Sequence, residues 1–135
     1  MTDILIVDDN ADTRRLIRVT LESEFKVQEA PDGATALALM RELHPAIVFL
    51  DVMMPGRMNG LQVLTEIRED PTLRETTVVM VTGRCEPSDV ANARRHGADG
   101  YLVKPFSTLE LLEWVRAQPL YRLPDTAETR QRFLI

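Results

Sequence analysis

ILIVDD at residues 4–9 and AIVFLD at residues 46–51 decide the fold of this chain, because each is a short apolar run that ends in aspartate. If the two runs form neighbouring parallel strands, the carboxylates of Asp8, Asp9 and Asp51 meet at one edge of a sheet. Like charges at such short separations repel strongly, so the group either takes up protons or binds a cation. Carboxylate oxygens are hard ligands that favour Mg²⁺, and the two stretches therefore predict a magnesium site.

Size and composition are those of one ordinary folded domain. The chain has 135 residues, 44% of them hydrophobic, which is enough for a buried core. Its net charge is -5 and it has no run of Lys and Arg, so direct binding to DNA is not expected. Its longest apolar runs have about five residues, whereas a membrane span needs roughly 20. Cys85 is the single cysteine and no signal peptide precedes Ile4, so we expect a cytoplasmic protein without a membrane segment.

Short β-branched runs alternate along the chain with segments whose apolar residues recur three and four positions apart. The first pattern predicts strands and the second predicts helices with one buried face. Strands are expected at Ile4–Val7, Lys26–Glu29, Ala46–Leu50, Thr77–Val81 and Gly100–Val103. Helices are expected around Leu16–Leu21, Ala34–Ala38, Leu61–Ile67, Ser88–His96 and Thr108–Ala117, and the fourth is weakly apolar and so loosely packed. Strict alternation predicts an α/β domain with a doubly wound parallel sheet and helices on both faces.

Two further polar residues follow the later strands. Thr82 comes directly after the fourth expected strand, and Lys104 comes after the fifth, just before Pro105. Doubly wound sheets bind ligands at the carboxyl ends of their strands, so both side chains are expected beside the aspartates. A metal site, a hydroxyl and an ammonium group are what a transferring phosphoryl group needs, because its oxygens carry charge that must be neutralised. A carboxylate can itself be the nucleophile.

With these residues in place, the chain resembles the receiver domains of bacterial response regulators, of the chemotaxis type. The likeness covers residues 3 to about 118 and rests on several short motifs in the expected order. These are Asp8-Asp9, Asp51, Met54-Pro55, Asn59-Gly60, Thr82-Gly83 and Lys104-Pro105. The resemblance implies a flavodoxin-like sheet of five strands in the order 2-1-3-4-5.

The resemblance also implies a role for each site residue. Asp51 would accept a phosphoryl group from a histidine kinase or a histidine phosphotransfer protein, as in a phosphorelay. Asp8, Asp9, Asp51 and the backbone carbonyl of Met53 would hold Mg²⁺. Thr82 and Lys104 would contact the phosphoryl group. Such a domain is a signalling module rather than an enzyme for external substrates, although it catalyses its own phosphoryl transfer and autodephosphorylation.

In the family, phosphorylation acts through switch residues, matched here by Thr82, Tyr101 and Pro105. The loop after Thr82 would shift inward and Tyr101 would turn from exposed to buried. The surface made by the fourth helix, the fifth strand and the fifth helix would then change, and a downstream protein target would bind it. The Lys104-Pro105 bond resembles the family's cis peptide.

One loop departs from the family pattern. Gly56, Arg57 and Met58 make three residues between Pro55 and Asn59, where the family usually has two. The extra residue is either a harmless surface bulge, which we favour, or it brings Arg57 to the phosphoryl group or to a partner. Met53 and Arg84 occupy positions that influence phosphoryl lifetime in the family, and the sequence does not set that lifetime.

Other interpretations of these residues stay open. Asp9 or Asn10 could simply cap the first helix, Thr82 could be an ordinary strand-end hydroxyl, and Lys104 could be an ordinary solvated lysine. At the level of function, the chain could be a receiver-like scaffold that is never phosphorylated, or a small Mg²⁺-dependent phosphohydrolase with Asp51 as nucleophile. Met53 argues against the hydrolase, because a second acidic residue is expected two positions after its nucleophile.

We divide the chain into a receiver domain at residues 1–118 and a C-terminal tail at residues 119–135, which is a short helix or a linker. The tail ends in Phe133, Leu134 and Ile135, and packing onto the domain or self-association as a homodimer is favoured over disorder. The tail is too short for an output domain, so the chain is either a stand-alone receiver or part of a larger protein.

Overall fold

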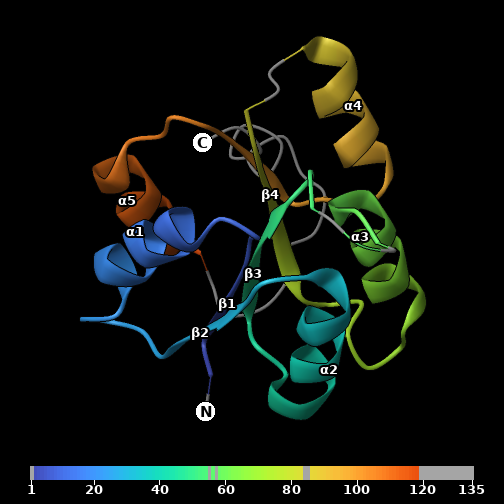
Figure 1. Ribbon diagram of the computed structural model, residues 1–135, viewed down its shortest axis with the longest axis horizontal. Coiled ribbons are helices and arrows are strands. Elements are labelled where there is room, and N and C mark those ends of the chain that lie inside the picture. Colours follow the sequence, from blue (N-terminus) through green and yellow to red (C-terminus); the bar gives the residue numbers. More distant parts are fainter. Residues whose placement is uncertain (1, 55, 57, 84–85, 119–135) are drawn as a thin grey trace.

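The structure is a computed structural model that describes residues 2–54, 56, 58–83 and 86–118. Within this part of the chain, strands and helices alternate strictly (Figure 1). The strands are β1 (Ile4–Val7), β2 (Val27–Ala30), β3 (Ile47–Asp51), β4 (Thr77–Thr82) and β5 (Gly100–Val103). The helices are α1 (Ala11–Leu21), α2 (Gly33–Leu43), α3 (Gly60–Glu69), α4 (Pro87–Arg95) and α5 (Thr108–Ala117). The expected tail lies outside the described residues.

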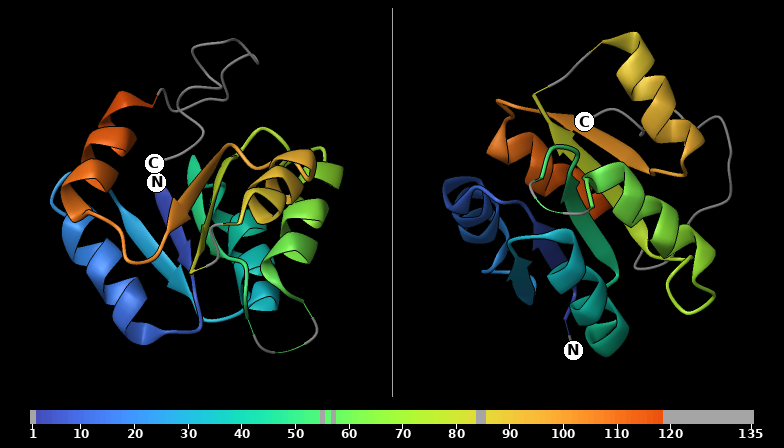
Figure 2. Two further views of the ribbon diagram at one scale, coloured as in Figure 1. Left: turned by 90° about the horizontal axis from the view of Figure 1, so that it is seen from above. Right: turned by 45° about the vertical axis from the view of Figure 1, so that its right-hand side comes forward.

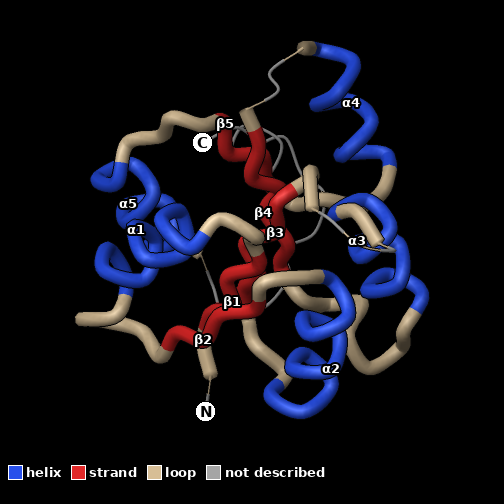
Figure 3. The backbone as a smooth tube through the Cα atoms, in the orientation of Figure 1, coloured by secondary structure: helices blue, strands red, loops and turns tan. Residues whose placement is uncertain are grey.

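The strands form a parallel sheet in the order β2-β1-β3-β4-β5. The expected doubly wound, flavodoxin-like topology is therefore confirmed. Helices α1 and α5 cover one face of the sheet, and α2, α3 and α4 cover the other (Figures 1 and 2). The strand order reverses between β1 and β3, and sheets of this kind bind ligands outside the carboxyl ends of the strands at such a point. Figure 3 shows the central strands running together between the two helical layers.

The core consists of two layers because successive strand residues point to opposite faces of the sheet. In β1, Leu5 and Val7 pack with the layer of α2, α3 and α4, whereas Ile4 and Ile6 pack with the layer of α1 and α5. All four residues of β1 are buried, as a strand covered on both faces requires. Full burial of each such side chain stabilises the fold by about 1.5–3 kcal/mol. On the α5 side, Trp114 meets Phe49 of β3 edge to face, with ring centroids 6.5 Å apart.

Helix α4 is held more weakly than its neighbours. Ala93 is its buried residue, and its N-cap, Glu86, makes no side-chain capping hydrogen bond. By contrast, α3 buries four residues and begins with a reciprocal pair of hydrogen bonds between Asn59 and Gln62. The expectation of a loosely packed fourth helix is confirmed.

Arg68, near the end of α3, stabilises the end of the sheet opposite the aspartates. Its guanidinium donates to the carbonyl oxygens of Gly97, Arg74 and Thr76 at 2.7–2.9 Å and to the carboxylate of Asp99 at 2.7 Å. The same carboxylate oxygen of Asp99 accepts a hydrogen bond from the N–H of Val78, at the start of β4. This junction joins α3, β4 and the entry to β5. No helix among the described residues has the length and apolar character needed to cross a membrane.

Candidate functional site

Three carboxylates meet at the point where the strand order reverses. Asp8 and Asp9 follow β1, and Asp51 is the last residue of β3. One carboxylate oxygen from each lies within 4.8 Å of the others. Asp8 and Asp51 are buried, with 2% and 5% of their surface exposed, whereas Asp9 is exposed. The predicted acidic cluster is therefore formed by the fold, with Asp51 as the last residue of the strand rather than the residue directly after it.

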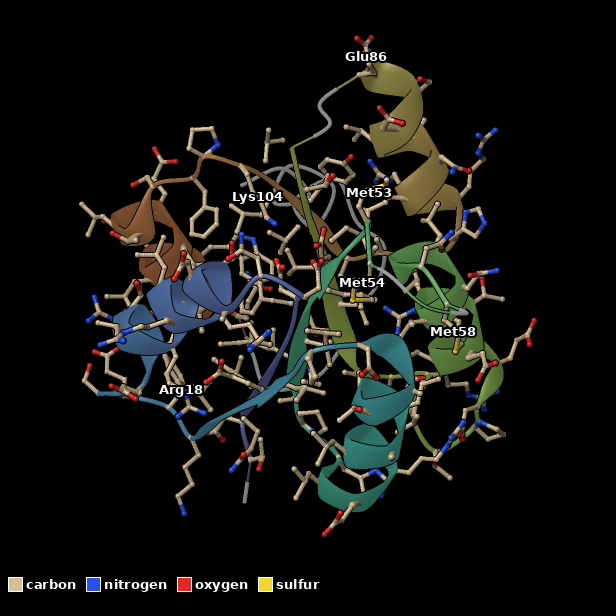
Figure 4. All side chains as sticks on the ribbon, viewed as in Figure 1. Arg18, Met53, Met54, Met58, Glu86 and Lys104 are labelled. Atoms are coloured by element: carbon tan, nitrogen blue, oxygen red, sulfur yellow. The ribbon has the colours of Figure 1, made fainter. Side chains whose placement is uncertain are left out.

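Lys104 joins this cluster from the end of β5. Its ammonium nitrogen lies 3.0 Å from Oδ2 of Asp8 and 3.8 Å from Oδ2 of Asp51. Its backbone N–H donates to the carbonyl of Thr82 at 2.8 Å, which ties the loop after β5 to the end of β4. The Lys104-Pro105 peptide is cis, as predicted. The labelled side chain of Lys104 points toward the ends of the central strands in Figure 4.

Asp8 and Asp9 do not serve as the N-cap of α1. Asn10 is the N-cap of α1, and its side chain accepts hydrogen bonds from the N–H groups of Asp12 and Thr13. Asp8 instead accepts from the N–H of Asn10 at 2.8 Å, through Oδ1. The capping role that the sequence left open thus belongs to Asn10, and the carboxylates of Asp8 and Asp9 gather with that of Asp51.

The Asp51 carboxyl has an altered affinity for protons. Its burial, and then the nearby charge of Asp8, raise its pKa from 3.8 to about 7, against the opposing effects of Lys104 and of the Met53 N–H. Further positive charge beside the carboxyl would lower its pKa again, because an opposite charge favours the ionised form. The Met53 N–H donates to Oδ1 of Asp51 at 3.2 Å, which limits rotation of the carboxylate.

The start of α3 lies directly against Asp51. The N–H of Gly60 donates to the carbonyl of Val52 at 2.9 Å. A Cβ atom at position 60 would lie only 2.1 Å from the carbonyl oxygen of Asp51, so this approach requires glycine. Within the Asn59-Gly60 motif, Gly60 therefore lets α3 pack closely against the strand that carries Asp51.

Thr82 and Tyr101 lie on the same side of the sheet. Thr82 ends β4 and is 2% exposed, and Tyr101 in β5 is 1% exposed. Tyr101 pairs in register with Met80, two residues before Thr82, and both Met80 and Tyr101 belong to the core layer of α3 and α4. Tyr101 is thus already buried here. Pro105 is exposed, and Arg57, Arg84 and Cys85 lie outside the described residues.

The ligand set fits Mg²⁺. Opposite ligands of an octahedral Mg²⁺ lie about 4.2 Å apart, because each bond is about 2.1 Å long. The 4.8 Å limit among the oxygens of Asp8, Asp9 and Asp51 is only slightly larger, and all three donors are hard oxygens. The two buried carboxylates need positive charge, which Lys104 supplies in part.

Comparison with known proteins agrees with this site. A family model described as the response regulator receiver domain matches residues 4–116, and the chain belongs to that family. It is 40% identical over 116 residues to the transcriptional regulatory protein SrrA of Staphylococcus aureus, covering 85% of this chain and 46% of that protein. The chain therefore spans about half the length of these curated relatives.

Solved structures give the same result. The chemotaxis protein CheY4 of Vibrio cholerae has a TM-score of 0.79 and 31% identity, covering 86% of this chain and 97% of that one. The receiver domain of NtrX from Brucella abortus has a TM-score of 0.76 and 35% identity, covering 84% and 94%. The chain is a receiver domain of the two-component signalling family, and receiver domains are signalling modules.

Proposed function

We propose that Asp51 accepts a phosphoryl group from the phosphohistidine of a kinase or phosphotransfer protein, in a Mg²⁺-dependent step, and that the domain signals through its α4-β5-α5 face. The observation that carries this proposal is the placement of the buried Asp51 carboxylate beside Asp8, Asp9 and the ammonium of Lys104. Membership of the receiver family supports it.

In the proposed reaction, a carboxylate oxygen of Asp51 attacks phosphorus while the bond from phosphorus to the donor's imidazole nitrogen breaks. The electron pair of that bond stays on the imidazole, and an acyl phosphate forms on Asp51. Asp8, Asp9, Asp51 and the Met53 carbonyl are the proposed ligands of Mg²⁺, which when bound supplies positive charge to the phosphoryl oxygens. Lys104 neutralises another part of that charge and Thr82 donates its hydroxyl hydrogen. Water attack on the acyl phosphate would reverse the modification, as autodephosphorylation.

The proposed signal starts at Thr82 and Lys104. A phosphoryl group on Asp51 adds negative charge and acceptor oxygens beside these two residues. The backbone bond from Lys104 to Thr82 links the ends of β4 and β5, so the two residues can move together. Tyr101 lies on the same face as Thr82, and α4 beyond it is weakly held. We therefore propose Thr82, Tyr101 and Pro105 as switch residues, with the phosphorylated state stabilising the buried position of Tyr101.

The partners in this proposal are proteins. A histidine kinase or phosphotransfer protein supplies the phosphoryl group and a downstream protein target binds the α4-β5-α5 face. The net charge of -5 supports a chain without direct DNA contact of its own. The receiver boundary at residue 118 fits the family match, which ends at residue 116. A cytoplasmic location, a homodimer and a role for the tail stay predictions.

The test is the intact mass of the chain after incubation with acetyl phosphate and Mg²⁺, for the wild type and for Asp51→Asn. We expect one added phosphoryl group of about 80 Da in the wild type, and none in the variant or when EDTA replaces Mg²⁺. Rapid release of phosphate without a labelled species would favour a phosphohydrolase. Absence of both labelling and release, with a cognate kinase also inactive, would favour a scaffold.

A further inference from the structure

Arg14, in the first turns of α1, contacts the backbone of the acidic site. One of its terminal nitrogens donates to the carbonyl oxygen of Asp8 at 2.6 Å. That carbonyl belongs to the peptide that joins Asp8 to Asp9, so the contact holds the link between two of the three clustered carboxylates. The side chain of Arg14 is 18% exposed, so its charge is largely shielded from water.

Glu29 of β2 compensates this charge. Its carboxylate accepts from Nε of Arg14 at 3.0 Å and, through its other oxygen, from Nε of Arg18. The guanidinium of Arg14 therefore spans from the β2 carboxylate to the end of β1, in the two-pronged geometry that arginine allows and lysine does not. Without Glu29, the uncompensated charge of Arg14 beside the Asp8 carbonyl would oppose the binding of a cation.

Asp8 is thus held at four atoms. Its N–H donates to the carbonyl of Ala30, its Oδ1 accepts from Asn10 and its Oδ2 faces Lys104. Arg14 holds the fourth atom, the carbonyl oxygen. The contacts with Ala30, Asn10 and Arg14 come from neighbouring backbone and from α1. Together they fix the direction in which the chain continues to Asp9.

We propose that Arg14 is a positioning residue of the metal site, with Glu29 as its counter-ion. This inference rests on the proposed function, because it concerns the same Mg²⁺ site. Arg14 acts through the Asp8–Asp9 peptide and touches neither the cation nor the phosphoryl group.

A positioning role and a simple effect of charge predict opposite changes in Mg²⁺ affinity when Arg14 is removed. If its charge alone mattered, removing it would leave the site more negative and Mg²⁺ would bind more tightly. If it positions the Asp8–Asp9 peptide, removing it lets the two carboxylates diverge and Mg²⁺ binds more weakly. Contacts that orient metal ligands are typically worth 10–100-fold in affinity, and for this indirect contact we expect about tenfold.

The experiment compares Arg14→Ala with Arg18→Ala, using Mg²⁺ alone as the probe in titration calorimetry. Both variants remove one positive charge paired with Glu29, but only Arg14 contacts the Asp8 carbonyl. We expect the Kd for Mg²⁺ to rise about tenfold in Arg14→Ala and to change less than about twofold in Arg18→Ala. Arg14→Lys keeps the charge and loses the two-pronged contact, so its Kd should fall between those of the wild type and Arg14→Ala. Thermal unfolding without Mg²⁺ checks that each variant is folded.

Labelling by acetyl phosphate supplies a second readout. In Arg14→Ala, the Mg²⁺ concentration for half-maximal rate should rise with the Kd, while the rate at saturating Mg²⁺ stays within about twofold of the wild type. Tighter or unchanged Mg²⁺ binding by Arg14→Ala overturns the inference, as does equal weakening in both alanine variants. A wild type that binds no Mg²⁺ overturns the proposed function itself, which separates the two failures.

Discussion

At the scale of single residues, Asp51 makes the metal-free domain sensitive to pH. Its pKa is raised from 3.8 to about 7, first by burial and then by Asp8. An acid whose pKa is higher in the folded state binds its proton more tightly there, so folding stability falls as the pH rises. The contribution is fully present below about pH 4, is lost between about pH 4 and pH 7, and is constant above.

We therefore expect the free energy of unfolding of the Mg²⁺-free wild type to fall relative to Asp51→Asn across this window, by at most about 1.4 kcal/mol per pH unit. Urea titrations at pH 5, 6, 7 and 8 in EDTA measure the difference, which reports Asp51 together with the charges of Asp8 and Lys104 that interact with it. A difference that does not vary between pH 5 and 7 would contradict the raised pKa. Saturating Mg²⁺ should remove most of the pH dependence, because the cation favours the ionised carboxylate.

Gly60 is a second residue whose effect can be predicted. In Gly60→Ala, the new methyl group would lie 2.1 Å from the carbonyl of Asp51, so α3 or the end of β3 must move. Such overpacking costs about 1–3 kcal/mol, and displacement of Asp51 should also slow labelling by acetyl phosphate. The matched control for stability is Gly83→Ala, where no atom of the described residues, its own chain neighbours aside, lies within 4 Å of the added Cβ. Equal urea midpoints for the two variants would sink this explanation of the glycine.

At the scale of elements, the sequence predicted the sheet well because buried parallel strands and one-sided helices leave different periodicities. The ends of the strands differ from the prediction by about one residue where strand pairing continues past the apolar run. Asp51 is an example, because it belongs to β3 and pairs with Val81 of β4. Periodicity also indicated the weak fourth helix. Periodicity did not predict whether Tyr101 is exposed or buried, because an aromatic residue in an edge strand fits both positions.

Contacts that depend on the third dimension were missed altogether. Arg14 meets the Asp8 carbonyl only because α1 turns back over the end of β1 while β2 brings Glu29 alongside. A weak signal was present, since an arginine near the start of a helix opposes the usual preference for acidic residues there. The aspartates, Thr82 and Lys104 were found because each directly follows or ends a strand, which fixes its place without any distance information.

The contrast between α3 and α4 leads to a prediction for hydrogen exchange. Helix α3 has a reciprocal cap and four buried residues, whereas α4 lacks a side-chain cap and buries Ala93. A missing cap alone is worth about 1 kcal/mol, roughly fivefold in an opening equilibrium. In exchange followed by mass spectrometry, peptides from α4 should therefore exchange at least about fivefold faster than those from α3. Similar protection of the two helices would argue against α4 as the mobile part of the proposed signalling face.

At the scale of the whole molecule, the two ends of the strands in the sheet have different roles. The carboxyl ends of β1, β3 and β5 bring together the buried charges, which are costly to the fold. At the opposite end of the sheet, hydrogen bonds from Arg68 join α3, β4 and the entry to β5. The charged site and the Arg68 junction therefore lie at opposite ends of the sheet.

The contact between Trp114 and Phe49 has a practical consequence. The chain has a single tryptophan, and it packs on β3 two residues before Asp51, from the face that α4 does not cover. Indole emission depends on the packing and polarity around the ring. The fluorescence of Trp114 therefore reports on the strand that ends in Asp51, and the proposed binding of Mg²⁺ and transfer of a phosphoryl group can be followed by it without an attached dye.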